Sequence, residues 1–182
     1  LLGVRFERHG DTWASNSAPA FYRHWQVTGR WPGAAGECLV GSDAARELHA
    51  GSGEIIEIAV SDRSRSLRVV GLVNTGGAED TAIIAPLPAV QMLVNLPGKI
   101  SEADISALTT PENKLAEKYR LDPKTLTPTE YERWFCTPYP GSVAADVQKA
   151  VPGSVARVVR RVSESQGAVL SRIKGLVALL AL

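Results

Sequence analysis

The sequence predicts an α+β fold on three observations. Short β-branched segments bounded by turn residues alternate with capped amphipathic segments, which is typical of a mixed α/β core. After Thr110 the chain becomes charged, is punctuated by Thr and Pro, and leans toward helix. Near the C-terminus an apolar heptad pattern begins. We therefore expect a mixed α/β core lobe, an inserted helix-leaning lobe, a return helix of the core and a long amphipathic helix running into the start of a transmembrane helix, over residues 1–110, 111–140, 141–153 and 154–182.

Composition places the chain among globular proteins. With 182 residues, of which 45% are apolar, it is long enough for one domain or two small lobes. The net charge of +1 offers no bulk attraction for nucleic acid or an anionic membrane surface. The segment Leu1–Gly10 lacks the basic flank, apolar stretch and cleavage site of a signal peptide. Because the first residue is Leu1, we expect a processed chain or a piece of a longer protein.

Strands and turns dominate the first third of the chain. The segment 25–33, WQVTGRWPG, ends in a Pro-Gly turn, and 37–41, ECLVG, predicts a short buried strand. Ser42 is placed to cap a helix through DAARELHA, and Gly51 is placed to close it.

A hairpin, a strand and a helix are expected next. The β-branched segments EIIEIAV and LRVVGLV flank the polar turn SDRSRS, which predicts a hairpin. TAIIAP predicts a strand that ends at Pro86, and LPAVQMLVNLPG predicts a short helix with its apolar residues on one face. ADISALTT, residues 103–110, is a further strand candidate.

The charged region predicts helices. Thr110 and Pro111 are placed to open one helix, and the segment Thr127–Glu130 has the residues of a capping box. SVAADVQKAV predicts another helix, which stops at Pro152 and Gly153.

The two cysteines, Cys38 and Cys136, match no zinc spacing. Two interpretations stay open. Both residues could be buried thiols, or they could form one long-range disulfide, which would require an oxidising compartment.

The last segment has a heptad pattern that predicts a helix starting at a Ser154 cap. Apolar residues recur every seven positions in two series offset by four, and only Gln166 on this seam is polar. We expect Gln166 to fix the register against a neighbouring helix. The seam residues with this coupling role are Val155, Val159, Val162, Gln166, Val169 and Ile173.

From Gly175 onward every residue is apolar or Gly, so the seam widens to all faces of the helix. This run alone is too short to cross a bilayer, which takes about 20 residues. It is either a helix docked on the core or the first turns of a membrane helix that continues beyond Leu182. Arg172 and Lys174 directly before the run favour the membrane boundary, where long basic side chains reach the aqueous side.

No catalytic, cofactor-binding or metal-binding set can be assembled from spacing. The Ser171–Lys174 segment matches S-x-x-K but lacks the accompanying motifs of acyl-serine enzymes, and no glycine run fits a phosphate-binding loop. The three histidines, His9, His24 and His49, are scattered. Glu79 and Asp80 predict a solvated turn rather than a cation site.

Nucleic-acid binding is not expected either. The basic face Arg157, Arg160 and Arg161 lacks interleaved aromatic residues, so we expect a solvated face of the helix. The tryptophans are expected in core packing rather than in a ligand cage.

In order and spacing, these segments resemble the extracytoplasmic core domain of MacB/FtsX-like ABC transporter permeases. WQVTGRWPGAAGECLVGSDAARELHAGSGEIIEI resembles the family's W-x-V-x-G-R-W-P, E-x-L-V-G-x-x-x-A and G-(D/E)-x-(I/V) series. LRVVGLVNTGGAEDTAIIAPLPAVQ is similar to its V-V-G-(I/V)-x-x-T-G strand and the strand and helix that follow. VARVVRRVSESQGAVLSRIKGLVALL resembles the helix leading into the second membrane span. The resemblance covers nearly the whole chain. The region 111–140, with WFCTPYP, resembles a subset of these permeases associated with iron-uptake gene clusters.

The resemblance implies an ectodomain and not an enzyme. It implies a porter-like lobe and a variable second lobe on the extracytoplasmic side of a cell membrane, with no catalytic residue and no cofactor in this domain. ATP would be hydrolysed by a separate cytoplasmic ATPase subunit. The long helices would transmit that motion outward, a mechanotransmission role for which a stiff helix is suited. The implied partners are that ATPase, a second permease subunit in a homodimer or heterodimer, and an extracytoplasmic binding protein.

The alternative is a free-standing extracytoplasmic module that binds a metal or a peptide and is linked to iron uptake. A reading frame that continues apolar beyond Leu182 favours the permease, and a polar continuation or a stop favours the module.

Overall fold

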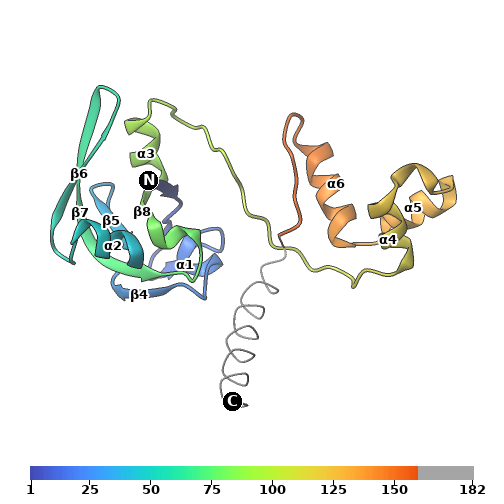
Figure 1. Ribbon diagram of the computed structural model, residues 1–182, viewed down its shortest axis with the longest axis horizontal. Coiled ribbons are helices and arrows are strands. Elements are labelled where there is room, and N and C mark those ends of the chain that lie inside the picture. Colours follow the sequence, from blue (N-terminus) through green and yellow to red (C-terminus); the bar gives the residue numbers. More distant parts are fainter. Residues whose placement is uncertain (160–182) are drawn as a thin grey trace, which may run out of the picture. The chain divides into compact units, whose positions relative to one another are not determined.

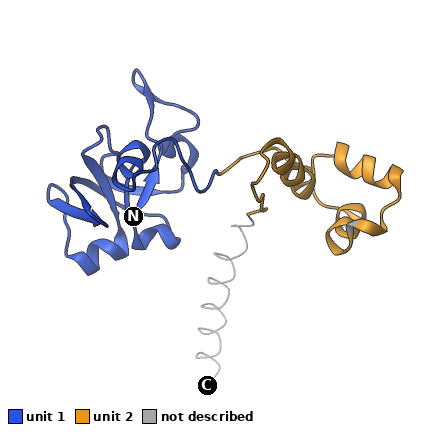
Figure 2. Ribbon diagram, turned by 90° about the horizontal axis from the view of Figure 1, so that it is seen from above, with its two compact units in different colours: residues 1–103 blue, residues 104–182 orange. Residues whose placement is uncertain are grey.

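The chain has the predicted α+β architecture. The computed structural model describes residues 1–159 and divides the chain into two compact units, Leu1–Ala103 and Asp104–Leu182 (Figures 1 and 2). Unit 1 holds a mixed sheet with short helices, and the described part of unit 2 is helical.

Unit 1 is built on a six-stranded sheet in which β7 is the longest strand. The order is β1-β8-β5-β7-β4, and β6 also pairs with β7. β5 pairs with β7 in parallel and with β8 antiparallel, while β4 and β6 both pair with β7 antiparallel. The strands are β1 Leu2–Val4, β4 Gln26–Gly29, β5 Glu37–Gly41, β6 Ile55–Val60, β7 Arg63–Asn74 and β8 Ile83–Pro86.

The predicted hairpin is confirmed as β6 and β7, with a shorter turn than expected. The pairing runs from Ile55 opposite Arg68 to Val60 opposite Arg63, so most of the SDRSRS segment belongs to β7. Ser61 has a φ of 55°, in the left-handed region that a tight hairpin turn uses.

The sheet buries one cluster on each face, because successive side chains of a strand point to opposite sides. Cys38 and Val40 of β5 pack with α2 (Ser42–Leu48) and α3 (Leu87–Leu93) in one cluster. Leu39 of the same strand packs in the other cluster, with Trp25 and further aromatic residues. The remaining elements of unit 1 are β2 Arg8–His9, β3 Thr12–Trp13, α1 Ala18–Phe21 and the 3-10 helix η1 Ala78–Thr81.

The ends of α2 differ from the prediction. Its N-cap is Gly41 and not Ser42, whose hydroxyl donates to Asp43 instead. The helix ends at His49, which takes the left-handed conformation with a φ of 53°, before Gly51 is reached.

Unit 2 packs its helices around Trp134, which is almost fully buried. The Tyr119 ring stacks on Trp134 with centroids 3.4 Å apart, and Ala116 and Tyr139 complete the cluster. The capping box at Thr127 and Glu130 is confirmed, with both reciprocal bonds present. The elements are α4 Lys114–Leu121, the 3-10 helix η2 Pro123–Thr125, α5 Pro128–Cys136 and α6 Pro140–Ala150.

Several boundaries differ from those expected. The division falls after Ala103 rather than Thr110, and residues 103–110 form no strand. α4 begins at Lys114, because the Asn113 side chain accepts the N–H groups of its first turn. α6 was expected to return to the core lobe, but it belongs to unit 2, where it packs against α5.

Residues 154–159 have no regular secondary structure, so the long helix does not begin at Ser154 as expected. The Ser154 hydroxyl donates back to Val151 O at 2.8 Å, in the turn that closes α6, instead of capping a following helix. The expected helix over residues 160–182 lies outside the described residues. Within residues 1–159, no helix combines the length and apolarity needed to span a bilayer.

Candidate functional site

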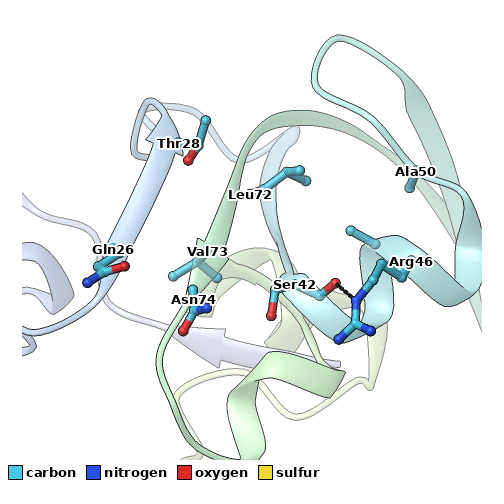
Figure 3. A pocket seen from close by; sticks show the side chains of 9 residues that line it. Gln26, Thr28, Ser42, Arg46, Ala50, Leu72, Val73 and Asn74 are labelled. Atoms are coloured by element: carbon cyan, nitrogen blue, oxygen red, sulfur yellow. Dashed lines mark hydrogen bonds between the residues drawn. The ribbon is translucent and has the colours of Figure 1, made fainter.

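Unit 1 carries a groove of about 540 Å³ between α2, β4 and β7 (Figure 3). Its lining combines polar side chains with apolar ones. The lining residues are Gln26, Thr28, Ser42, Ala45, Arg46, Ala50, Leu72, Val73 and Asn74.

The pairing of β4 with β7 explains which side chains reach this groove. Thr28 lies opposite Leu72, and Gln26 lies opposite Asn74. Residues directly opposite in an antiparallel pair share a face. Leu72 packs against the cluster that contains α2, so these four side chains lie on the α2 face.

Arg46 is the positively charged residue of the groove lining, and the carboxylate that pairs with it is exposed to solvent. The guanidinium forms an ion pair with Asp43, and its Nε donates to Ser42 O at 3.4 Å. Asp43 does not line the groove, and the lining contains no carboxylate. The groove therefore offers uncharged hydrogen-bonding groups, one cation and apolar side chains. The Ser42 hydroxyl in the lining donates to the Asp43 carboxylate at 3.4 Å, and the lining as a whole can form hydrogen bonds with a polar ligand.

A hydrogen-bonded loop fixes the segment between β4 and β5. Both terminal guanidinium nitrogens of Arg30, Nη1 and Nη2, donate to the Glu37 carboxylate, Nη1 at 2.7 Å. The same carboxylate accepts the backbone N–H groups of Gly33 and Ala34, at 2.8 Å and 3.3 Å. The bonds from Arg30, followed by those from the backbone, lower the pKa of Glu37 to about 2. The carboxylate therefore closes this loop and is not available to a ligand.

The Glu79–Asp80 turn was expected to be solvated, but Asp80 is buried at 8% exposure. Its two carboxylate oxygens accept the N–H groups of Thr75 and Gly76, at 2.6 Å and 3.1 Å. The loop also packs closely against Gly41, where an added Cβ would lie 2.3 Å from Asp80 O. Asp80 thus stabilises the fold of this loop. In the sequence it is an acidic residue shortly after two glycines, which is also the pattern of a solvated turn.

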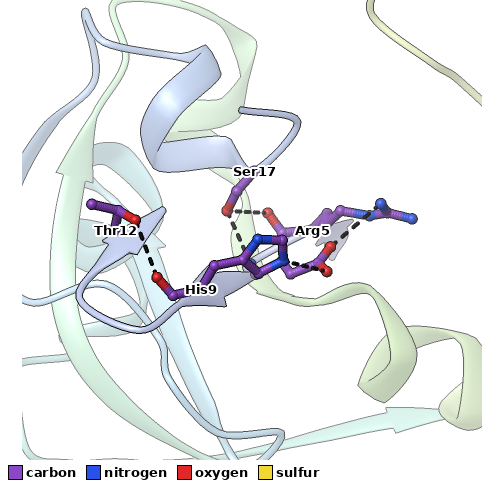
Figure 4. Close-up of polar contacts among 5 residues, drawn as sticks. Arg5, His9, Thr12 and Ser17 are labelled. Atoms are coloured by element: carbon purple, nitrogen blue, oxygen red, sulfur yellow. Dashed lines mark hydrogen bonds and ion pairs between the residues drawn. The ribbon is translucent and has the colours of Figure 1, made fainter. Parts of the chain in front are cut away.

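Serine, histidine and glutamate come near one another in the N-terminal segment, but without catalytic geometry (Figure 4). The fully buried Ser17 hydroxyl donates to Arg5 O at 3.4 Å and accepts the Glu7 N–H at 3.0 Å. His9 Nε2 lies 3.3 Å from Glu7 Oε1, so its partner is the carboxylate and not the serine. A nucleophile needs its hydroxyl bonded to a base and open to substrate. Ser17 instead links its own segment to the backbone of Arg5 and Glu7 through hydrogen bonds.

Both cysteines are free thiols. Cys38 is fully buried in the sheet, and burial raises its pKa to about 12, whereas Cys136 at the end of α5 is exposed. The Cys38–Cys136 disulfide, one of the two open interpretations, would require opening the core around Cys38. The alternative of two buried thiols holds for Cys38 alone.

The structure describes only the first two residues of the predicted helix seam. Val155 and Val159 are exposed, at 73% and 60%, in non-helical backbone. Val162, Gln166, Val169 and Ile173 lie outside the described residues. Over residues 1–159, no three metal-ligating side chains converge on one point.

No protein-family model and no curated protein matches this sequence.

Proposed function

We propose that this chain is the extracytoplasmic domain of a MacB/FtsX-like ABC transporter permease. In this role it couples ATP-driven movement of membrane helices to the handling of a substrate or partner outside the membrane. ATP is hydrolysed on a separate cytoplasmic ATPase subunit, and the domain contributes no catalytic residue and no cofactor.

The order and spacing of the sequence motifs carry this proposal. W-x-V-x-G-R-W-P covers β4 and the loop after it, E-x-L-V-G is β5, and V-V-G lies within β7. These three strands are neighbours in the sheet, in the order β5-β7-β4. Motifs that are separate in sequence thus form one continuous piece of structure, as expected of a shared fold.

The conformation of the motif residues supports the same proposal. Gly29 has a φ of 108°, and a Cβ there would lie 2.6 Å from Val70 O. Both the backbone conformation and the lack of space explain why the motif has a glycine at this position. The Trp25 and Trp31 rings stack with centroids 6.3 Å apart, and Arg30 closes the loop to Glu37. Trp25, Gly29, Arg30 and Trp31 of the motif therefore each have a physical role in this arrangement.

The first test is the parent reading frame. We expect ten or more further apolar residues after Leu182, completing a span of about 20. A stop codon or a polar continuation there would contradict the proposal.

The second test uses the full parent protein, tagged and extracted from membranes. We expect an ATPase subunit to copurify and to hydrolyse ATP in proteoliposomes, with Gln166→Leu lowering the coupled activity. Glu164→Gln, which lies off the predicted seam, is the matched control. Unchanged assembly and activity in Gln166→Leu would refute the coupling role, and the absence of any ATPase partner would refute the permease.

A further inference from the structure

The outer edge of β4 borders the groove and has no assigned role. β4 is the terminal strand of the sheet, and in the part of the chain that the structure describes it pairs only with β7. Its four residues, Gln26–Gly29, are half-buried or exposed. An edge strand with free backbone groups can accept a further strand from another chain.

The ladder shows which backbone groups of β4 are free. The Arg30 N–H donates to a β7 carbonyl at 3.0 Å, and the carbonyl oxygens of Thr28 and Arg30 lie 2.9 Å and 3.0 Å from where a Cβ on Gly71 would sit. These groups therefore point toward β7. Because the backbone groups of successive strand residues point to opposite sides, the N–H and C=O groups of Val27 and Gly29 point outward. No described residue bonds to them.

The groove lies beside this edge on the α2 face. Gln26 and Thr28 belong both to β4 and to the groove lining (Figure 3). A strand added to β4 would place every second side chain on the same face, about 5 Å from Gln26 or Thr28. A long side chain at such a position reaches over β4 into the groove. Backbone pairing and side-chain recognition can thus occur in one bound segment.

The charge of the groove selects the kind of side chain. Its cation is Arg46, and no carboxylate lines it. The Arg46–Asp43 pair is solvent-exposed on both sides, with side-chain exposures of 79% and 48%. Such pairs contribute little to stability, so Arg46 can exchange its partner at low cost. A carboxylate on the incoming segment complements this lining better than an amide or a cation.

We propose that β4 binds an extended peptide segment of a partner protein, which adds to the sheet as a further strand and places a carboxylate side chain in the groove. A second copy of this chain fits less well, because paired β4 strands would bring together two cationic grooves. The inference depends only on unit 1 and is independent of the proposed permease function. It is tested without membranes or an ATPase, so either proposal can fail alone.

The test uses the full chain, labelled with ¹⁵N, and the capped peptide TVEVEVT as a probe, with TVQVQVT for comparison. We expect saturable amide shifts at Val27 and Gly29 by about 1 mM peptide, with tighter binding of the Glu peptide. Val27→Pro removes an outward N–H without removing a ladder bond and should weaken binding about tenfold. Val27→Ala, the matched control, should change it by less than about twofold.

A second variant separates recognition from folding. Arg46→Gln should bring the affinity ratio of the Glu and Gln peptides to about one while leaving the Val27 shifts in place. The proposal is overturned if no shifts occur up to about 1 mM, or if they centre on β1 or unit 2. It is equally overturned if the β4 shifts depend on protein concentration without peptide, since the occupant would then be a second copy.

Discussion

Replacing Glu37 by Gln should destabilise unit 1, because one carboxylate closes the whole loop between β4 and β5. Glu37 accepts bonds from Arg30, Gly33 and Ala34, and its side chain is only 17% exposed. Its pKa falls from 4.5 to about 2, which corresponds to at most about 3.4 kcal/mol at 1.36 kcal/mol per pKa unit. Arg30 is 57% exposed, so solvent screens the pair, and we expect a loss of about 1–2 kcal/mol.

The pH dependence of stability gives an independent test of the same prediction. A carboxylate with a lowered pKa stabilises the fold above its unfolded pKa, and the stabilisation is lost as pH falls through the folded pKa. The difference between wild type and Glu37→Gln should therefore be full at pH 7 and shrink between about pH 4.5 and pH 2. Gln cannot titrate, so the variant lacks this contribution at every pH.

Urea unfolding followed by the amide NMR signals of unit 1 measures this difference separately from unit 2. Glu57→Gln on β6 is the matched control, because Glu57 is exposed opposite Ser66, and it should change stability by less than about 0.5 kcal/mol. The reasoning is refuted if the two variants are equally stable at pH 7. A Glu37→Gln deficit that stays constant down to pH 2 would refute the role of the charge.

Three further predictions use the same preparations. Gly41→Ala places a Cβ 2.3 Å from Asp80 O and should lower the free energy of unfolding of unit 1 by about 1–3 kcal/mol in urea. Gly36→Ala, which has open space around it, should leave it unchanged. Equal effects of the two variants would contradict the steric explanation. Trp134→Ala should remove about 3–5 kcal/mol from unit 2 and leave the amide signals of unit 1 in place, and loss of both sets of signals would show that the units do not fold separately. Thiol titration of unreduced protein should find one reactive cysteine, Cys136, in the native state and two after unfolding; finding none after unfolding would establish a disulfide.

Sequence reasoning succeeded where the signal is local. Alternation and turn residues suffice for the β6–β7 hairpin, because both strands and the turn are contiguous in the chain. The capping box at Thr127 and Glu130 spans three residues, and its bonds form inside one helix turn. The strand β8 and the helix α3 that follows it were predicted for the same reason.

Sequence reasoning failed where the structure depends on partners distant in the chain. ADISALTT has a strand-like composition, but among residues 1–159 no strand pairs with it, and it forms none. Asp80 is buried because the segment Asn74–Gly77 wraps around its carboxylate, which its spacing does not reveal. α6 has the amphipathic pattern of a core helix, and only the position of Trp134 shows which core it joins.

The groove was missed for a related reason. Its lining comes from β4, α2 and β7, and none of Gln26, Ser42, Arg46 and Asn74 belongs to a recognisable chemical motif. Only the pairing of β4 with the end of β7 brings them together. A signal for the free edge does exist in hindsight, since Gly29 and Pro32 stop β4 after a short run.

The residues that carry the family resemblance and those that line the groove differ in what their substitution should change. Gly29, Arg30 and Glu37 are constrained by backbone clash and by the loop they close, so substitutions there act on folding whatever the chain binds. Gln26 and Arg46 are exposed and bonded weakly or not at all within the core, so substitutions there can change the ligand and leave the fold intact. Chains that share the motif should therefore share this sheet while differing in the groove. Partner specificity is accordingly best sought by exchanging groove residues between such chains and repeating the peptide titration.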